Sequence, residues 1–425
     1  MKIIHTADLH LGQVIYQNYE RRDEHAHFFS QLLRWCKEER PDALIVCGDV
    51  FDIQQPSNTT RAEFNDYFVQ LHQACPDVKI VIAAGNHDSA SRIEADHKVW
   101  ALAGVHVVGM APSTEMLKRP DGWQDRFIVE LESGFIAALP YATGERKDLL
   151  QSILDRIAER NVEGKPVVMM GHQAVAGMDC TGHGFEIGKI KTLALSAFGE
   201  GFDYLALGHI HMPQTIGYPD DRLRMEAVTY PAGVARYSGS VLHVSCDEQY
   251  PHTVSVVEID HHGGEVKLRQ LRIDELRHFY VLPLDGSSFD SEKAALAAVD
   301  DFIATHESGY IRLRVDYNVT LAANFSQQVY DRIEPTGEDV RYNPKIIWTG
   351  CPEHTASEDE LPQFEVEELQ QMDNPLDFIE KTIDQYPGLN LDMLREAFEE
   401  IEAEMKRMDD AEEEKKQKKS KKVKE

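Results

Sequence analysis

The sequence contains no long apolar run and no closely spaced pair of cysteines. Nothing in it approaches the ~18 consecutive apolar residues of a membrane helix, and Asp8 comes too early for a signal peptide. The six cysteines lie far apart and form no C-x-x-C, which excludes a zinc ribbon and a redox dithiol. We therefore expect a cytoplasmic protein without membrane contact, whose thiols are reduced and several of them buried.

Positive charge is also scarce, because 44 Lys and Arg stand against 73 Asp and Glu, for a net charge of -29. A nucleic-acid partner usually goes with a basic excess, so this balance argues against one at first sight. The charge is uneven: residues 353–414 sum to -18, residues 415–425 to +6 and residues 1–352 to -17. If the body binds a polyanion, local basic patches or bound cations must offset its charge.

What the sequence does contain is an ordinary globular composition over 425 residues, enough for two or three folded units. The first 210 residues alternate short aliphatic runs, turns and stretches of helical periodicity such as 24–39 and 60–74. This alternation predicts an α/β layered domain. The segments 127–139, 225–245 and 254–271 resemble strand, turn and strand, so we expect part of the sheet system to be less parallel.

The chain divides into five regions by composition and periodicity. The first domain extends over 1–272, and a smaller α/β cap follows at 275–352. An acidic linker at 353–372 leads to amphipathic helices at 373–410 and to a charged tail at 411–425. We expect that tail to be disordered and solvated rather than an arm that binds nucleic acid.

The helical region at 373–410 fits two roles. Asp373-Asn374-Pro375 predicts a helix start, and apolar residues from Leu391 to Met408 recur at alternating steps of three and four. A helix packed on its own protein and a helix offered to a partner fit this pattern equally well.

Five short motifs stand at the carboxyl ends of predicted strands and contain most of the reactive side chains. In an open α/β sheet such positions converge in one crevice, and the neighbouring glycines allow the turns that aim the side chains. The motifs are Asp8-Leu9-His10-Leu11-Gly12, Gly48-Asp49-Val50-Phe51-Asp52, Gly85-Asn86-His87-Asp88, Gly171-His172 and Gly208-His209-Ile210-His211. Each is a weak signal alone, but core packing does not explain all of them in order.

The imidazoles, carboxylates and one amide of these motifs are numerous enough to hold two divalent ions. Imidazole with oxygen ligands suits Mn, Fe, Zn or Co, and the lack of cysteine disfavours a structural zinc site. Two ions about 3.5 to 4 Å apart can activate a water and clamp the oxygens of an in-line phosphoryl displacement. A carboxylate that bridges both ions suits such a site, and Asp49 is our candidate.

With these motifs the sequence resembles the calcineurin-like metallophosphoesterases, whose pattern is D-x-H, G-D-x-x-D, G-N-H-D/E, G-H and G-H-x-H. Every element is present. The segments Tyr237-Ser238-Gly239-Ser240 and Cys246-Asp247-Glu248 are similar to the nuclease subunits of bacterial complexes that contain an SMC-like ATPase. The likeness is specific over about 1–260, weaker over the cap and general beyond 353. It implies a four-layer αββα sandwich, followed by the cap and a C-terminal helical extension.

The resemblance also implies a role for each motif residue. It implies one ion held by Asp8, His10, Asp49 and His211, and a second held by Asp49, Asn86, His172 and His209. His87 is then catalytic and faces the scissile phosphate, with Asp88 as its orienting partner; an imidazole that titrates near neutrality suits this task. We interpret Asp52 as a support for a ligand or as a helix cap rather than as a ligand.

The candidates for substrate contact are less specific. Tyr16, Arg21 and Arg22 lie in an aromatic and basic stretch that fits a DNA-contacting loop and an ordinary rim of the active site equally. His183 is the one further histidine that we consider for substrate contact, and we take the others as structural or surface residues.

The resemblance implies a manganese-dependent DNA nuclease, a 3'-to-5' exonuclease on double strands and an endonuclease on single strands and hairpins. It implies DNA repair and recombination as the setting, and a homodimer joined to the ATPase in a heterotetramer, with 375–408 as the docking segment. A phosphatase or cyclic-nucleotide phosphodiesterase could use the same ions, and a non-catalytic scaffold could keep the fold. The cap and the helical tail favour the nuclease, and His87 beside a complete ligand set argues against the scaffold.

Overall fold

The computed structural model describes residues 1–16, 19–118, 122–144, 146–180 and 192–350. Within this part of the chain, residues up to 350 belong to one compact unit. The predictions for the linker, the amphipathic helices and the charged tail lie outside the described residues.

Two mixed sheets form the body of the molecule. The first has seven strands, in the order β12 (Val228–Tyr230), β15 (Val266–Arg272), β14 (Thr253–Ile259), β1 (Lys2–Thr6), β4 (Ala43–Cys47), β5 (Lys79–Ala83) and β6 (Val105–Val108). The second has six, in the order β11 (Gln214–Thr215), β13 (Val234–Tyr237), β10 (Tyr204–Gly208), β9 (Val167–His172), β8 (Gly134–Ala138) and β7 (Ile128–Leu131).

Each sheet contains four neighbouring parallel strands, and its remaining strands join them by antiparallel pairs. β1, β4, β5 and β6 run parallel in the first sheet, as do β8, β9, β10 and β13 in the second. β4 is buried at every residue, as expected of a parallel strand covered on both faces. The carboxyl ends of these parallel strands therefore lie at common edges of the two sheets.

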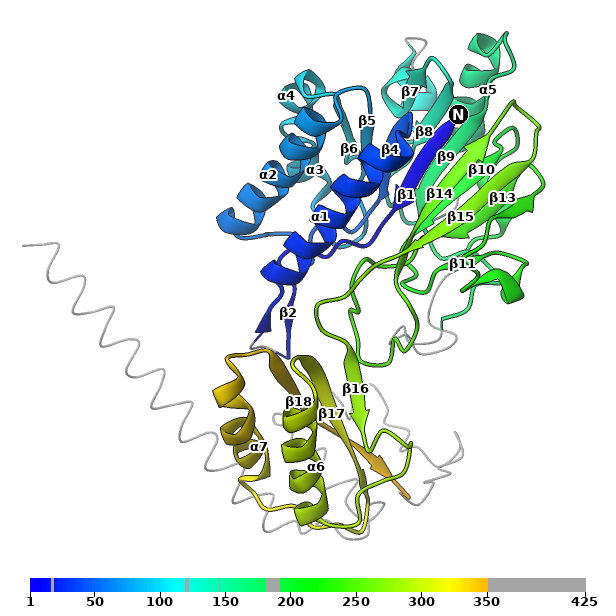
Figure 1. The fold of residues 1–425 in the computed structure, drawn as a ribbon. Helices are drawn as coiled ribbons and strands as arrows, with labels where there is room; N and C mark the ends of the chain where they lie inside the picture. The colour runs from blue at the N-terminus through cyan, green and yellow to red at the C-terminus, as the bar shows by residue number, and fades with distance from the viewer. Residues whose placement is uncertain (17–18, 119–121, 145, 181–191, 351–425) are drawn as a thin grey trace, which may run out of the picture. The chain divides into compact units, whose positions relative to one another are not determined.

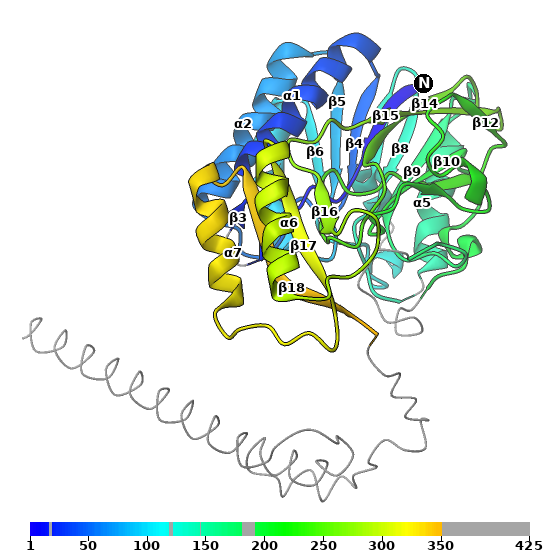
Figure 2. The same cartoon turned by 60° about the horizontal axis from the view of Figure 1, so that its bottom comes forward.

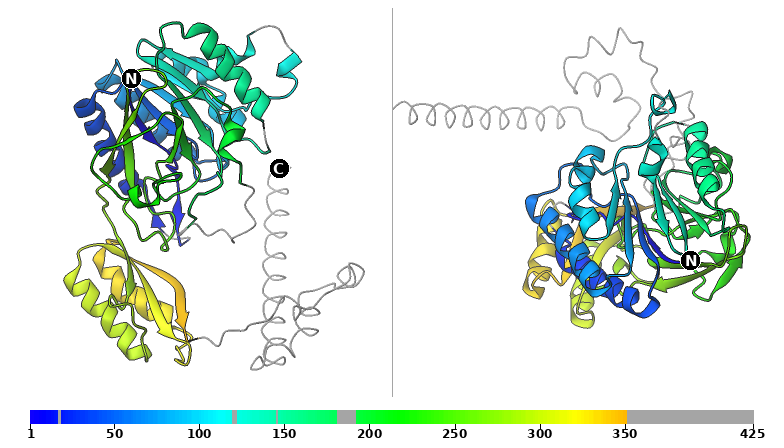
Figure 3. Two further views of the ribbon diagram at one scale, coloured as in Figure 1. Left: turned by 90° about the vertical axis from the view of Figure 1, so that its right-hand side faces the viewer. Right: turned by 90° about the horizontal axis from the view of Figure 1, so that it is seen from above.

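Helices cover the outer faces of the two sheets (Figure 1). Those packed on the first sheet are α1 (Arg22–Glu39), α2 (Asn58–Ala74), α3 (Ala90–Glu94) and α4 (His97–Leu102), and α5 (Lys147–Arg160) packs on the second. The view from above in Figure 3 shows helices on both outer sides with the sheets between them. This confirms the four-layer α/β sandwich that the resemblance implies.

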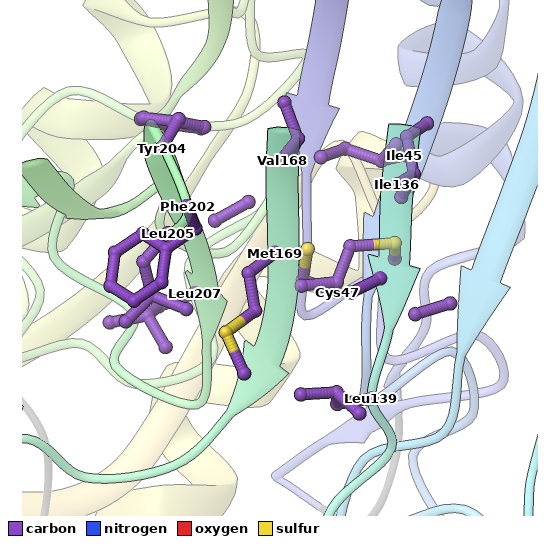
Figure 4. Packing of buried hydrophobic residues seen from close by; sticks show 14 of the residues in the cluster. Ile45, Cys47, Ile136, Leu139, Val168, Met169, Phe202, Tyr204, Leu205 and Leu207 are labelled. Carbon is purple, nitrogen blue, oxygen red and sulfur yellow. The ribbon is translucent and has the colours of Figure 1, made fainter. Parts of the chain in front are cut away.

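The largest core lies between the two sheets. Side chains of β4 such as Ile45 and Cys47 lie among those of β8 and β9, including Ile136 and Met169 (Figure 4). A second core fills the space between the first sheet and α1 and α2, around Phe28 and Phe68. Since the first sheet is packed on both faces, its strands hold their carboxyl ends firmly in place.

The region 225–245 contains the expected strand, turn and strand, but its two strands belong to different sheets. β12 pairs with β15 in the first sheet, whereas β13 pairs with β10 in the second, so the chain passes from one sheet to the other at residues 231–233. Pro231 has no N–H to continue a ladder, and Gly233 adopts a φ of +86°. The other two segments form antiparallel hairpins, β7 with β8 and β14 with β15.

Residues after Glu275 build a sheet of their own. β16 (Phe279–Leu282), β17 (Gly309–Asp316) and β18 (Val340–Thr349) are parallel. α6 (Glu292–Thr305) and α7 (Phe325–Ile333) cover one face of this sheet (Figure 2). A separate core around Val299, Leu313 and Val329 holds these elements together.

Buried polar groups join this cap to the start of α1. The Tyr310 hydroxyl donates to Glu24 Oε2 at 2.9 Å, and Arg21 Nε donates to the same oxygen at 2.6 Å. Arg341 Nη1 donates to the Tyr310 hydroxyl at 2.6 Å. The small β2 (Val14–Ile15) and β3 (Tyr19–Glu20) hairpin packs against the same place through Ile15 and Tyr19.

Within the described residues, we find no helix that is both long and apolar enough to cross a membrane. The described residues include five cysteines, and none of them forms a disulfide. Three of them are buried; the five are Cys36, Cys47, Cys75, Cys180 and Cys246.

The first prediction concerns His5, which is buried between the sheets with Nδ1 2.8 Å from the Tyr204 hydroxyl. Burial, helped by the charge of Arg236, lowers the pKa of His5 to about 3. The unfolded chain therefore binds a proton that the folded chain does not, and stability falls as the pH drops from about 6.5 toward 3. We expect this residue to contribute a slope of up to about 1.4 kcal/mol per pH unit in the free energy of unfolding.

Urea denaturation between pH 7.5 and 5 measures this slope. The slope should be smaller in His5→Asn and unchanged in His261→Gln, which alters an exposed histidine on the turn after β14. Equal slopes for wild type and His5→Asn would contradict the assignment.

Candidate metal centre

The predicted ligands follow the carboxyl ends of neighbouring parallel strands. Asp8 and Asp49 come after β1 and β4, and Asn86 comes after β5. His172 ends β9, and His209 comes directly after β10. Because the inner faces of the two sheets pack on each other, these ends meet.

The backbone at the site is strained where these side chains turn inward. Asp8, His10, Asp49 and His209 all have positive φ, between 46° and 96°. This region is unfavourable for residues other than glycine and is found mainly at functional sites.

Three glycines of the motifs allow the segments to approach closely. A Cβ on Gly48 would lie 2.1 Å from His172 Nδ1, and one on Gly85 would lie 2.0 Å from Asp49 Oδ1. A Cβ on Gly208 would lie 1.9 Å from the Cys47 carbonyl oxygen. These glycines are therefore needed for contact between the motif loops, in addition to the turns for which the sequence suggested them.

All seven predicted ligands lie together in two neighbouring groups. Asp8, His10 and His211 offer ligand atoms within 4.8 Å of one another, and so do Asp49, His172 and His209. Asn86 Oδ1 joins the second group, 3.0 Å from His172 Nε2 and 2.9 Å from His209 Nδ1.

The hydrogen bonds of His172 show why this pocket fits a cation. Its Nδ1 donates to the Cys47 carbonyl at 2.7 Å, which fixes the ring and leaves Nε2 facing Asp49 Oδ2 at 3.3 Å and Asn86 Oδ1. Unless a proton or a metal ion lies there, Nε2 presents a lone pair to two acceptors. His10 Nε2 is buried, and no hydrogen-bond partner faces it among the described residues.

The electrostatics of the buried carboxylates agree with this. Burial raises the pKa of Asp8 to about 7. The nearby imidazolium of His172 acts in the opposite direction, and the carboxylate of Asp49 raises the pKa further. Burial also acts on Asp49, but His172 and His10 outweigh it and hold its pKa well below the usual range. Burial alone would lower the pKa of His172, yet Asp49 raises it to about 9. The pocket thus gathers positive charge around its carboxylates, and divalent ions with carboxylate and imidazole ligands suit it.

Glu248 supports the first group and was not among the predicted site residues. Its Oε1 accepts from His211 Nδ1 at 2.7 Å, and its Oε2 accepts the Val244 N–H at 2.9 Å. A carboxylate on the far nitrogen of a metal-binding histidine fixes the ring and raises its basicity. The segment Cys246-Asp247-Glu248 contributed to the resemblance, but no pattern in the chain indicated that Glu248 reaches a residue 37 positions away.

The expected pairing of Asp88 with His87 is wrong. The buried Asp88 carboxylate accepts the N–H groups of Val50, Phe51 and Gly85, at 3.1, 2.9 and 2.8 Å. Three backbone donors satisfy a buried carboxylate, so Asp88 braces two motif loops. The exposed His87 instead donates from Nδ1 to the Asp52 carbonyl at 2.7 Å.

Asp52 contacts a predicted ligand through its side chain. Its Oδ1 lies 3.2 Å from His10 Nδ1, as expected of a support for a ligand. The alternative role as helix cap is not observed, because Ser57 caps α2 and accepts the Thr60 N–H. Asp52, His10 and His87 also form a third group whose ligand atoms lie within 4.8 Å of one another.

The substrate-contact candidates separate in the structure. Arg21 is buried and bonds Glu24, Gln13 and the His243 carbonyl, so its predicted place on a substrate loop is wrong. Tyr16 lies against Tyr310 of the cap, with ring centroids 6.2 Å apart.

Arg22 is exposed, pairs with Glu63 and lines a groove next to Gly12 and Thr60. His183 lies outside the described residues.

Comparison with known proteins agrees with this geometry. Residues 1–213 match the model of the calcineurin-like phosphoesterase family. The chain belongs to this family of metal-dependent phosphoesterases.

Among curated proteins, the chain is similar to the SbcD component of the SbcCD nuclease of Rhodobacter capsulatus, with 28% identity over 75% of this chain and 82% of the relative. It is 30% identical to the SbcD component of the SbcCD nuclease of Escherichia coli, over 60% of this chain and 65% of that protein. Among solved structures, a dimetal phosphatase from Danio rerio matches with a TM-score of 0.36 and 11% identity, over 65% of this chain and 99% of that one.

The second prediction concerns Glu248. Replacing it with alanine frees the His211 ring, so we expect Glu248→Ala to weaken divalent-ion binding by about 10- to 100-fold. Competition against a metal-chelating dye measures the affinity. The matched control is Asp247→Ala, which removes the exposed neighbouring carboxylate. If both variants bound ions as tightly as wild type, Glu248 would have no role at the centre.

Proposed function

We propose that this protein is a manganese-dependent DNA nuclease that hydrolyses phosphodiester bonds. The observation that carries the proposal is the convergence of all seven predicted ligands on one pocket, with His87 exposed at its edge. The similarity to the SbcD components of SbcCD nucleases supports DNA as the substrate. Double-strand exonuclease action in the 3'-to-5' direction and endonuclease action on single strands and hairpins belong to the same proposal.

Two divalent ions fit the donors of this pocket. Asp8, His10, Asp49 and His211 would hold the first ion, and Asp49, Asn86, His172 and His209 would hold the second. When bound, such ions lower the pKa of a water and neutralise charge that develops on the phosphate. Asp49 lies between the two ligand groups: its Oδ1 accepts the backbone N–H of His87 at 2.8 Å, and its Oδ2 faces His172.

His87 is placed to handle the leaving oxygen. The Asp52 carbonyl can only accept, so Nδ1 of His87 carries the hydrogen and Nε2 is the free nitrogen. In the imidazolium form Nε2 can give a proton to the departing 3' oxygen, the usual task of a general acid. The His87 and His10 ring centroids lie 5.0 Å apart, so this proton is delivered beside the first ligand group.

The setting proposed for the enzyme is DNA repair and recombination in the cytoplasm, in a heterotetramer of two copies of this chain and two copies of an SbcC-type SMC-like ATPase. The names of the relatives, each a subunit of an SbcCD nuclease, support a partner of the SbcC type. Arg22 is our candidate for contact with the DNA backbone, since it is exposed on the groove beside the first motif.

The third prediction tests the activity with end-labelled linear duplex DNA, p-nitrophenyl phosphate and bis-p-nitrophenyl phosphate, in Mn²⁺, Mg²⁺ or EDTA. Wild type should degrade the DNA with Mn²⁺. His87→Gln should keep its ions and lose roughly 10²- to 10⁴-fold in rate, the usual contribution of a general acid, while His261→Gln should match wild type. Asp49→Ala should lose both ions and activity.

Turnover of the small phosphates without DNA cleavage would instead support a phosphatase or a cyclic-nucleotide phosphodiesterase. Loss of bound ions in His87→Gln would make that residue a ligand.

The fourth prediction concerns the partner. Deletion of residues 365–425 should abolish association with the cognate ATPase in a pull-down and leave nuclease activity on small DNA substrates intact. Undiminished association would rule out the docking role of 373–410.

A further inference from the structure

A second buried cluster of metal-ligand side chains lies on the other side of Glu248 from the candidate centre. His243 follows β13, His252 precedes β14, and Glu275 follows β15. Each offers a ligand atom, and the three atoms lie within 4.8 Å of one another. His252 is 0% exposed and His243 is 7% exposed, whereas Glu275 as a whole residue is half-buried, so the two imidazoles have little contact with solvent.

The hydrogen bonds of His252 repeat the pattern of His172. Its Nδ1 lies 2.7 Å from the Ser240 carbonyl oxygen and 3.1 Å from the Ser240 hydroxyl oxygen. When Nδ1 donates to the carbonyl, Nε2 carries a lone pair in the neutral ring. That Nε2 is buried, has no hydrogen-bond partner among the described residues, and faces Glu248 Oε2 at 3.7 Å. With hydrogen on Nδ1, the neutral ring and Glu248 present two acceptors to each other in a buried place, and a cation between or beside them satisfies both.

His243 and Glu275 form the other half of the cluster. His243 Nδ1 lies 3.2 Å from Glu275 Oε1, and the backbone carbonyl of Glu248 accepts from the same imidazole. The His243 and His252 ring centroids are 4.2 Å apart. Each ring is thus oriented by a backbone carbonyl, the arrangement usual for metal-binding histidines.

The charged groups near the cluster leave an excess of negative charge that a divalent ion can balance. Glu248 and Glu275 are two buried carboxylates. Arg21 reaches the His243 backbone carbonyl, but Glu24 at 2.6 Å balances its charge. His278 contacts the outer oxygen of Glu275 at 2.6 Å and leaves the inner one to the cluster.

We propose that His243, His252 and Glu275 form a third metal site, which takes a divalent transition ion such as Zn²⁺. Two histidines and one glutamate are a common zinc ligand set, and imidazole favours Zn²⁺ or Co²⁺ over Mn²⁺ or Mg²⁺. The ion links His252, which precedes β14, to Glu275, which follows β15. It also lies beside Glu248 and stabilises the position of this carboxylate, which accepts a hydrogen bond from His211.

The fifth prediction measures ions rather than activity, so that it stands apart from the nuclease proposal. The full chain is stripped with EDTA, loaded with Co²⁺ and dialysed; bound cobalt is then measured by mass spectrometry and visible absorption. Asp49→Ala, which disrupts the candidate centre, should retain about one Co²⁺ per chain. Adding His252→Gln or Glu275→Gln in that background should remove it.

The matched control in the same background is His27→Gln, which removes an imidazole that contacts Asp274, the neighbour of Glu275, outside the cluster. It should keep the ion. Glu275→Gln preserves the size of the side chain, and circular dichroism checks the fold of each variant. Equal cobalt content in the Asp49→Ala parent and its His252→Gln and Glu275→Gln derivatives would overturn the proposal, as would an Asp49→Ala protein that binds no cobalt.

Discussion

The structure depends on the burial of negative charge where the two sheets meet. Asp8 and Asp49 follow central strands and are almost fully buried. Burying an unpaired carboxylate is unfavourable by several kcal/mol, so the surrounding groups must supply positive charge and hydrogen bonds. The imidazoles of His10 and His172 and the backbone N–H of His209 meet Asp8 or Asp49 from both sheets. The sheets therefore have to pack face to face with their strand ends aligned.

This requirement explains features far from the two carboxylates. Close contact between the motif loops needs glycine at positions 48, 85 and 208. The Asp88 carboxylate gathers N–H groups from two loops, so that they move as one. Hydrogen bonds among Arg21, Glu24 and Tyr310 connect the cap to the start of α1. Arg21 also donates to Gln13, which lies three residues after His10. These hydrogen bonds form a continuous path from the cap to the segment that follows His10.

The sequence was sufficient to predict the layered α/β fold and the motifs that converge, because a buried strand and the polar residue at its end are adjacent in the chain. The assignment of seven of these residues as ligands came from the resemblance to the family. Contacts between distant segments could not be predicted in this way. Asp88 stands next to His87 in sequence but turns to the backbone of Val50 and Phe51. Arg21 looked like a surface residue until the cap supplied Tyr310. For the same reason, the pattern at 225–245 indicated strand, turn and strand but not that the two strands belong to different sheets.

Because the chain passes between the sheets at residues 231–233, strands that come after residue 213 are needed to complete both sheets. The family model ends at residue 213, yet β14 lies beside β1 in the middle of the first sheet, and β13 lies beside β10 in the second. A chain that stopped at 213 would leave β1 and β10 as open edges, with unpaired N–H and C=O groups that invite aggregation. The segment that matches the family model is thus shorter than the part of the chain that builds the two sheets, which reaches to the end of β15 at Arg272.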